Sequence, residues 1–82
     1  MVYHSDIEAA ELRFLVRSGK LRFGGNSKLK IYGTPGCKSG KRMLITNRVF
    51  FDSEKAAIHA GYRPCAHCLY TRYKAWKHLQ NA

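Results

Sequence analysis

Three cysteines carry the clearest chemical signal in this sequence of 82 residues. Cys65 and Cys68 form a Cys-x-x-Cys pair, and two thiolates at this spacing can hold one tetrahedral zinc ion while backbone N–H groups of the turn donate to the sulfurs. The same spacing also occurs in redox motifs, which usually open a helix in a thioredoxin-like βαβ setting. No parallel-sheet pattern surrounds this pair, and the redox interpretation leaves Cys37 unexplained. We therefore favour a structural Zn2+ site.

Cys37 is the third expected ligand, because a turn of polar and flexible residues is a poor place to bury a thiol as an apolar group. The sequence has no fourth cysteine, so the fourth ligand is a histidine or water. We choose His4, which precedes the first expected helix and can fold inward. The other histidines are most simply solvent-facing: His59, His67 and His78. A fourth position filled by water would make the zinc reactive.

The charge balance points to a polyanionic partner. Fifteen Lys and Arg face five Asp and Glu, which gives a formal charge of +10. Such an excess in a small domain favours DNA, with a generally basic surface as the alternative. The expected DNA-binding residues lie around the cysteine-bearing turns: Lys38, Lys41, Arg42, Arg48 and Arg63. The Gly40-Lys41 step lacks the remaining residues of a phosphate loop, so we expect no nucleotide cofactor.

The length predicts one domain over residues 1–82, and a core this small often needs a metal or a disulfide. No apolar run has the length of a signal peptide core or of a membrane span. We therefore expect a cytoplasmic, monomeric protein without a membrane partner. Cysteines stay reduced in the cytoplasm, which again favours a metal over a disulfide.

The elements that must position the cysteines form an α+β pattern. We expect an N-terminal helix, a small three-stranded antiparallel sheet, a short helix, the Cys-x-x-Cys zinc knuckle and a C-terminal amphipathic helix. Ser5 and Glu8 have the spacing of a capping box, and Gly19 would end the first helix. The apolar stripe expected on this helix is Ile7, Ala10, Phe14 and Leu15, and its basic second half complements the helix dipole through Arg13, Arg17 and Lys20.

The expected sheet begins with a hairpin. Residues 20–23 and 28–32 alternate polar and apolar side chains, and the Gly-Gly-Asn of residues 24–26 between them has turn composition. Leu29 and Ile31 would face inward. Residues 47–51 read as a third strand, after which Asp52 or Ser53 caps a short helix that Gly61 closes. The last helix carries an apolar stripe: Leu69, Tyr73, Trp76 and Leu79.

The stretch 47–68 combines the third strand, the short helix and the run Ala-Gly-Tyr-Arg-Pro-Cys-Ala-His-Cys. From Tyr32 to Cys68 the chain resembles the zinc-binding domain of the Ada family of bacterial DNA-alkylation repair proteins. In that family four cysteines hold zinc, and one zinc-bound thiolate accepts a methyl group from a methylphosphotriester in DNA. The resemblance implies that Cys65 and Cys68 are the second ligand pair.

The first pair of the family is Cys-x-x-x-Cys, and only one member of it exists here. If Cys37 is the second cysteine, the first position falls on Gly33 and the attacking thiolate is absent. If Cys37 is the first cysteine, the second position falls on Lys41, and Cys37 remains available for methylation. The distance to Asn47 favours the first alignment, which needs the smaller length change. The chain looks closer to short stand-alone relatives, which are described only as metal-binding proteins.

We therefore expect a small zinc-binding module that binds DNA through a basic face without catalysis. One alternative is a stoichiometric methyl acceptor acting through zinc-bound Cys37, because the metal keeps a thiolate deprotonated and nucleophilic. The other is a protein-interaction module in which zinc only holds the fold. Salt-dependent binding to plain duplex DNA separates the DNA-binding function from the protein-interaction function.

Overall fold

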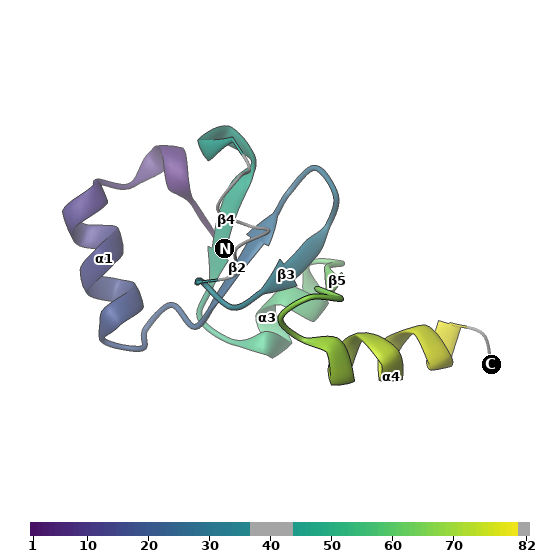
Figure 1. Cartoon of the computed structure of the whole chain (residues 1–82). Helices are drawn as coiled ribbons and strands as arrows, with labels where there is room; N and C mark the ends of the chain where they lie inside the picture. Colours follow the sequence, from purple (N-terminus) through teal and green to yellow (C-terminus); the bar gives the residue numbers. More distant parts are fainter. Residues whose placement is uncertain (37–43, 81–82) are drawn as a thin grey trace.

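The computed structural model describes residues 1–36 and 44–80. Its centre is a five-stranded sheet in the order β1-β4-β2-β3-β5 (Figure 1). The strands are Val2–Tyr3 (β1), Phe23–Asn26 (β2), Ile31–Gly33 (β3), Arg48–Phe51 (β4) and Arg63–Pro64 (β5). Neighbouring strands are antiparallel, except that β3 and β5 run parallel. The predicted α+β class is confirmed, whereas the predicted three-stranded antiparallel sheet is wrong: the sheet is larger and mixed.

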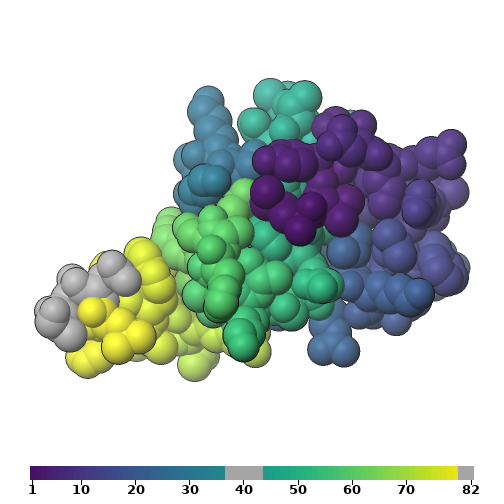
Figure 2. Space-filling view, turned by 180° about the vertical axis from the view of Figure 1, so that it is seen from behind, coloured from purple at the N-terminus to yellow at the C-terminus, as the bar shows by residue number. Residues whose placement is uncertain are grey.

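Helices cover the two faces and one edge of this sheet. The described α-helices are Ala9–Arg17 (α1), Glu54–His59 (α3) and Tyr70–Gln80 (α4), with short 3-10 turns at His4–Asp6 (η1) and Ile45–Asn47 (η2). Helix α4 contacts β5 at the sheet edge and projects from the body, so the longest dimension of the molecule is 43 Å (Figures 1 and 2). In residues 1–36 and 44–80, no helix combines the length and apolarity needed to cross a membrane.

Strand β4 joins two clusters of buried side chains. Val49, Phe50 and Phe51 are all buried, although successive strand residues point to opposite faces. Val49 and Phe51 belong to a cluster with Tyr32 and with Ala57 of α3. Phe50 belongs to the second cluster, which includes Leu12 of α1. The sheet therefore has α3 on one face and α1 on the other.

The ends of two helices follow the predicted chemistry. Ser53 is the N-cap of α3, and its hydroxyl oxygen accepts a hydrogen bond of 3.1 Å from the Ala56 N–H. Gly61 follows α3 with φ +87°, and Gly19 follows α1 with φ +81°. A glycine adopts this left-handed backbone without the steric cost that a Cβ brings. These three predictions are confirmed.

The first helix begins later than predicted. Ser5 lies in η1, Ile7 has extended backbone, and Glu8 occupies the N-cap position without a side-chain capping bond. The predicted capping box is therefore wrong. The buried residue of α1 is Leu12, whereas Phe14 is 59% exposed. The two extended residues between η1 and α1, Ile7 and Glu8, interrupt the helical period, so the apolar stripe cannot run continuously from Ile7 through Phe14.

The first hairpin is also shifted. The predicted turn residues 24–26 belong to β2, and the chain reverses at residues 27–30 instead. There the Asn26 side-chain oxygen accepts hydrogen bonds from the N–H groups of Lys28 and Leu29, at 3.0 and 3.1 Å, and Lys30 has φ 57°. Such an Asx turn is an alternative to the glycine turn. Leu29 is 62% exposed, so its predicted inward position is wrong.

Candidate metal centre and basic face

The Cys-x-x-Cys turn lies between β5 and α4 and is fixed to β3 by backbone hydrogen bonds. The Cys65 N–H donates to the Tyr32 carbonyl at 2.8 Å. The Leu69 N–H donates to the Cys65 carbonyl at 3.1 Å, which closes the turn. The parallel pairing of β3 with β5 therefore brings two cysteines from late in the chain beside a strand from its middle.

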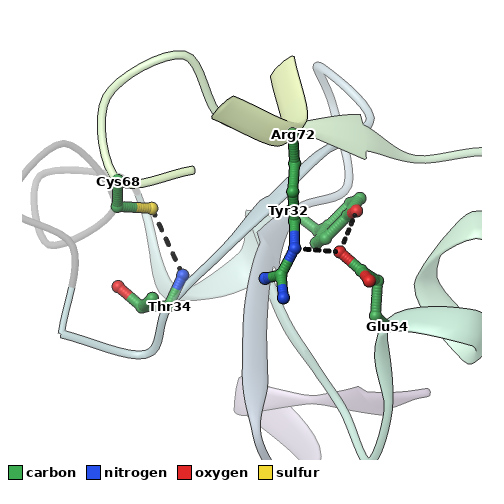
Figure 3. A network of polar contacts seen from close by, with 5 residues as sticks. All are labelled: Tyr32, Thr34, Glu54, Cys68 and Arg72. Atoms are coloured by element: carbon green, nitrogen blue, oxygen red, sulfur yellow. Dashed lines mark hydrogen bonds and ion pairs between the residues drawn. The ribbon is translucent and has the colours of Figure 1, made fainter. Parts of the chain in front are cut away.

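Backbone N–H groups surround the two sulfurs. Thr34 donates from its N–H to Cys68 Sγ at 3.3 Å (Figure 3), and His67 donates to Cys65 Sγ at 3.4 Å. Backbone N–H groups that donate to cysteine sulfurs are the kind of partner that orients metal ligands. Two cysteine sulfurs with such partners are a donor set that suits zinc, so this half of the predicted site fits the metal.

Gly33 lies directly under the cysteine pair. A Cβ built on Gly33 would stand 2.6 Å from Cys68 Sγ and 3.2 Å from Cys65 Cβ. Real Cβ atoms essentially never approach another atom as closely as 2.6 Å, so a side chain at position 33 would displace the sulfur. The closure of the two cysteines on β3 therefore depends on the missing side chain of Gly33.

Within the described residues, no other predicted ligand is gathered with this pair. Cys37 lies outside the described residues. Residues 1–36 and 44–80 contain no group of three or more His, Cys, Asp or Glu side chains arranged to hold a metal. The His4 ring lies 5.8 Å from the Phe50 ring, centroid to centroid, and the remaining histidines are exposed: His59, His67 and His78. The assignment of His4 as a ligand stays a prediction.

Two of the predicted DNA-binding residues stand in one row across the sheet. The register pairs Arg48 with Asn26, Asn26 with Ile31, and Ile31 with Arg63. Residues in register share a face, so both arginines lie on the face that also carries Gly33 and the cysteine pair. The other predicted DNA-binding residues lie outside the described residues: Lys38, Lys41 and Arg42.

Arg48 is held by one hydrogen bond and one ring. Its Nη2 donates to the Pro35 carbonyl at 2.9 Å, and its Cζ lies 5.3 Å from the centroid of the Phe50 ring. Partial burial lowers the pKa of the Arg48 guanidinium, because removal from water disfavours the charged form. An anion beside this group would offset that cost.

Arg63 rests on the start of α4. Its Cζ lies 5.3 Å from the Tyr73 ring centroid and 5.6 Å from that of Trp76. Both aromatic side chains are half-buried, as the predicted apolar stripe of this helix required, whereas Leu79 at its end is 70% exposed. The two rings therefore support a cation at the sheet edge.

A polar network on the opposite face holds α4 in place. The Tyr32 hydroxyl donates to Glu54 Oε2 at 2.8 Å, and Arg72 Nε lies 3.2 Å from the same oxygen (Figure 3). Burial, followed by the Glu54 carboxylate, raises the pKa of Tyr32 far above its usual value. The network ties β3 and α3 to the helix that follows Cys68. Sequence reasoning missed it, because no local spacing links residues so far apart in the chain.

The sequence profile of one family, the metal-binding domain of Ada, matches residues 18–69. Comparisons with curated proteins and with solved structures found no match. The matched region runs from the end of α1 to the residue after Cys68, so it includes Gly33 and both described cysteines. It covers more than half of the chain, and the chain belongs to the family of the metal-binding domain of Ada.

Proposed function

We propose that this chain is a zinc-binding module of the Ada type that binds DNA through a basic face and does not accept methyl groups. Cys65, Cys68 and Cys37 would hold the metal, with His4 or water as the fourth ligand. A bound zinc would keep these thiolates deprotonated and would cross-link the sheet to the turn before α4. Its role here is structural.

Gly33 is the observation that carries this proposal. The alignment that treats Cys37 as the second cysteine of the family puts the first, attacking cysteine at position 33. Gly33 lies against both described cysteines, where a member of the same ligand set would be expected. It has no side chain, and Cys68 Sγ lies only 2.6 Å from the position its Cβ would take. The geometry thus supports this alignment and the loss of the methyl-accepting thiolate.

Covalent reach supports Cys37 as the third ligand. The Thr34 N–H already donates to Cys68 Sγ at 3.3 Å. Cys37 follows Thr34 by three residues, a length that spans at most about 11 Å when extended. A turn of the composition Thr-Pro-Gly-Cys can therefore return the thiol to the pair.

The charge distribution supports DNA as the partner. Arg48 and Arg63 share the sheet face of the cysteine pair. Three strand spacings of about 4.8 Å separate the two arginines, which gives about 14 Å across the sheet. Two cations at such a distance can contact different phosphates of one duplex. The net charge of +10 adds long-range attraction to this face.

The direct test is fluorescence anisotropy of a labelled duplex titrated with the zinc-loaded protein at several salt concentrations. We expect the logarithm of the binding constant to fall linearly with the logarithm of the salt concentration, with a slope of about −0.9 per phosphate contact. Lys41→Ala/Arg42→Ala should weaken binding at low salt. Lys55→Ala/Lys77→Ala removes the same charge from α3 and α4 and should weaken binding much less.

A second arm addresses methyl transfer. The protein is incubated with duplex DNA that carries methylphosphotriesters, and its mass is then measured. We expect an unmodified chain. A methyl group on Cys37 would replace the proposal with the methyl-acceptor function. Absence of salt-dependent DNA binding, with the fold intact, would instead favour the protein-interaction module.

A further inference from the structure

A second cluster of cations lies beside the row of arginines, on the side of α1. A pocket of about 340 Å³ opens between α1, η1 and β4. Its polar wall consists of Arg13, Arg17 and Arg48 with His4, and its apolar floor includes Phe50. Pro35, the start of the segment that leads to Cys37, forms another part of the wall.

The fold brings these arginines together from distant parts of the chain. Arg13 and Arg17 are four residues apart on α1, so they project from the same side of the helix. Leu12 of α1 is buried against Phe50, which fixes the helix over β4. Arg48 faces the helix from β4, where its Nη2 donates to the Pro35 carbonyl at 2.9 Å. A guanidinium carries five N–H donors, so Arg48 has donors to offer to a second acceptor.

Among the described residues, no acidic side chain lines this pocket. Within residues 1–36 and 44–80, the one ion pair joins Arg72 to Glu54, so none of the three arginines of the pocket has a carboxylate partner there. Three guanidinium groups around one cavity repel one another, and the partial burial of Arg48 adds a desolvation cost. An anion in the pocket would relieve both costs.

His4 adds an unmet hydrogen bond to the same wall. Its Nδ1 is buried and has no hydrogen-bond partner in the part of the chain that the structure describes. A buried polar atom without a partner costs free energy. The pocket wall therefore combines arginines that have no carboxylate partner with a histidine that has an unmet hydrogen bond, both within the described residues.

We propose that this pocket binds a phosphate group, and that a backbone phosphate occupies it when the protein is bound to DNA; this second part rests on the proposed function. A carboxylate has two oxygens, which one guanidinium can satisfy in a bidentate pair. Three guanidiniums match the several oxygens and the larger charge of a phosphate better. Arg13 and Arg17 also complement the dipole of α1. That role does not explain why both residues line one pocket with Arg48.

The experiment compares the zinc-loaded wild type with Arg13→Gln/Arg17→Gln and with the control Lys55→Gln/Lys77→Gln, which removes the same charge outside the pocket. Circular dichroism checks that each variant folds. In the first arm, inorganic phosphate is titrated at constant ionic strength while NMR follows the arginine Nε–H signals. We expect saturable shifts at Arg13, Arg17 and Arg48 in the wild type and in the control, and none in the pocket variant.

In the second arm, binding to duplex DNA is measured by anisotropy. Loss of one phosphate contact should weaken the complex about threefold to tenfold at low salt and reduce the salt slope by about one. The control should lose clearly less affinity. Both results together support the proposal in full.

Other outcomes distinguish phosphate binding by the pocket from the role of the pocket in DNA binding. Saturable phosphate binding with unchanged DNA affinity in the pocket variant would assign the pocket to a free phosphate or a phosphorylated small molecule, and would overturn the DNA part. Saturable phosphate binding without any DNA binding by the wild type would overturn the proposed function and leave the pocket standing. Phosphate shifts that do not saturate, with equal DNA losses in both variants, would overturn the pocket itself.

Discussion

One face of the sheet is packed by apolar side chains against α3, and the other combines an apolar cluster under α1 with a glycine beneath the cysteine pair. On the first face, Val49 and Phe51 are at most 1% exposed and lie with Tyr32 against α3. On the second face, Phe50 pairs with Gly24, and Gly24 pairs with Gly33. The Phe50 ring and Pro35 lie against Gly24, whereas the two cysteines lie against Gly33.

This contrast indicates where the proposed zinc would contribute to stability. The first face has an apolar cluster and the network of Tyr32, Glu54 and Arg72, so its side chains supply the stability themselves. The second face also holds the Cys65 and Cys68 side chains, which lie against Gly33. The proposed zinc would cross-link these two cysteines and add stability to this face.

Cys65→Ser should abolish zinc binding and most of the folded structure. In small zinc domains the free energy of metal binding, on the order of 10 kcal/mol, is folding free energy. Native mass spectrometry measures the bound zinc, and circular dichroism measures the fold. Addition of a chelator to the wild type should have the same effect. A well-folded, metal-free Cys65→Ser variant would show that the apolar clusters alone sustain the domain.

Phe51→Ala should lower the free energy of unfolding by about 3–5 kcal/mol, because it leaves a cavity in the face packed against α3. Urea denaturation of the zinc-loaded protein measures this change. Phe14→Ala is the matched control, since that ring is 59% exposed, and it should change stability by about 0.5 kcal/mol or less. Equal losses in the two variants would contradict the assignment of the core.

Gly33→Ala should weaken zinc binding about 10-fold to 100-fold, the range typical of a disturbed ligand environment. The new Cβ would stand 2.6 Å from Cys68 Sγ and must push the sulfur away. Gly36→Ala is the control, because a Cβ there meets no atom of the described residues within 4 Å. Competition with a chromogenic chelator measures both affinities. An unchanged zinc affinity in Gly33→Ala would show that the site does not depend on the missing side chain at position 33.

Tyr32→Phe should cost about 1 kcal/mol of stability near neutral pH through the loss of the hydrogen bond to Glu54. The raised pKa of Tyr32 means that the folded state holds this proton more tightly than the unfolded state. Its contribution is therefore complete below a pH of about 10, the ordinary tyrosine value, and is lost as the pH rises above it. The stability of the wild type should fall more steeply in that range than that of Tyr32→Phe. Tyr70→Phe, at an exposed ring, should follow the wild type, and parallel curves for all three proteins would contradict the assignment.

Sequence reasoning worked where a local signal determines local structure. Ser53 caps α3 because its hydroxyl reaches the Ala56 N–H within one turn, and Gly61 ends the helix because only its own backbone is involved. The motif around Cys65 and Cys68 identified the family from residue types and spacing alone, and the matching profile confirms it.

It failed where contacts between distant residues decide the structure. Gly25 looked like part of a turn, yet it lies in β2, where a Cβ would meet the Ile31 carbonyl at 3.0 Å and the Phe51 ring at 3.2 Å. Strands β1 and β5 have two residues each, too few for a periodic pattern, and exist only through their partners. Likewise, local spacing in the sequence does not predict that Arg13 and Arg17 line one pocket with Arg48.

The central claim is a zinc site that uses Cys37, Cys65 and Cys68 and has no side chain at position 33. Native mass spectrometry of protein purified without added metal, beside a Cys37→Ala variant, tests it most directly. We expect one zinc per chain in the wild type and its loss or marked weakening in the variant. A folded wild type without zinc, or a Cys37→Ala variant that retains zinc as tightly, would contradict it.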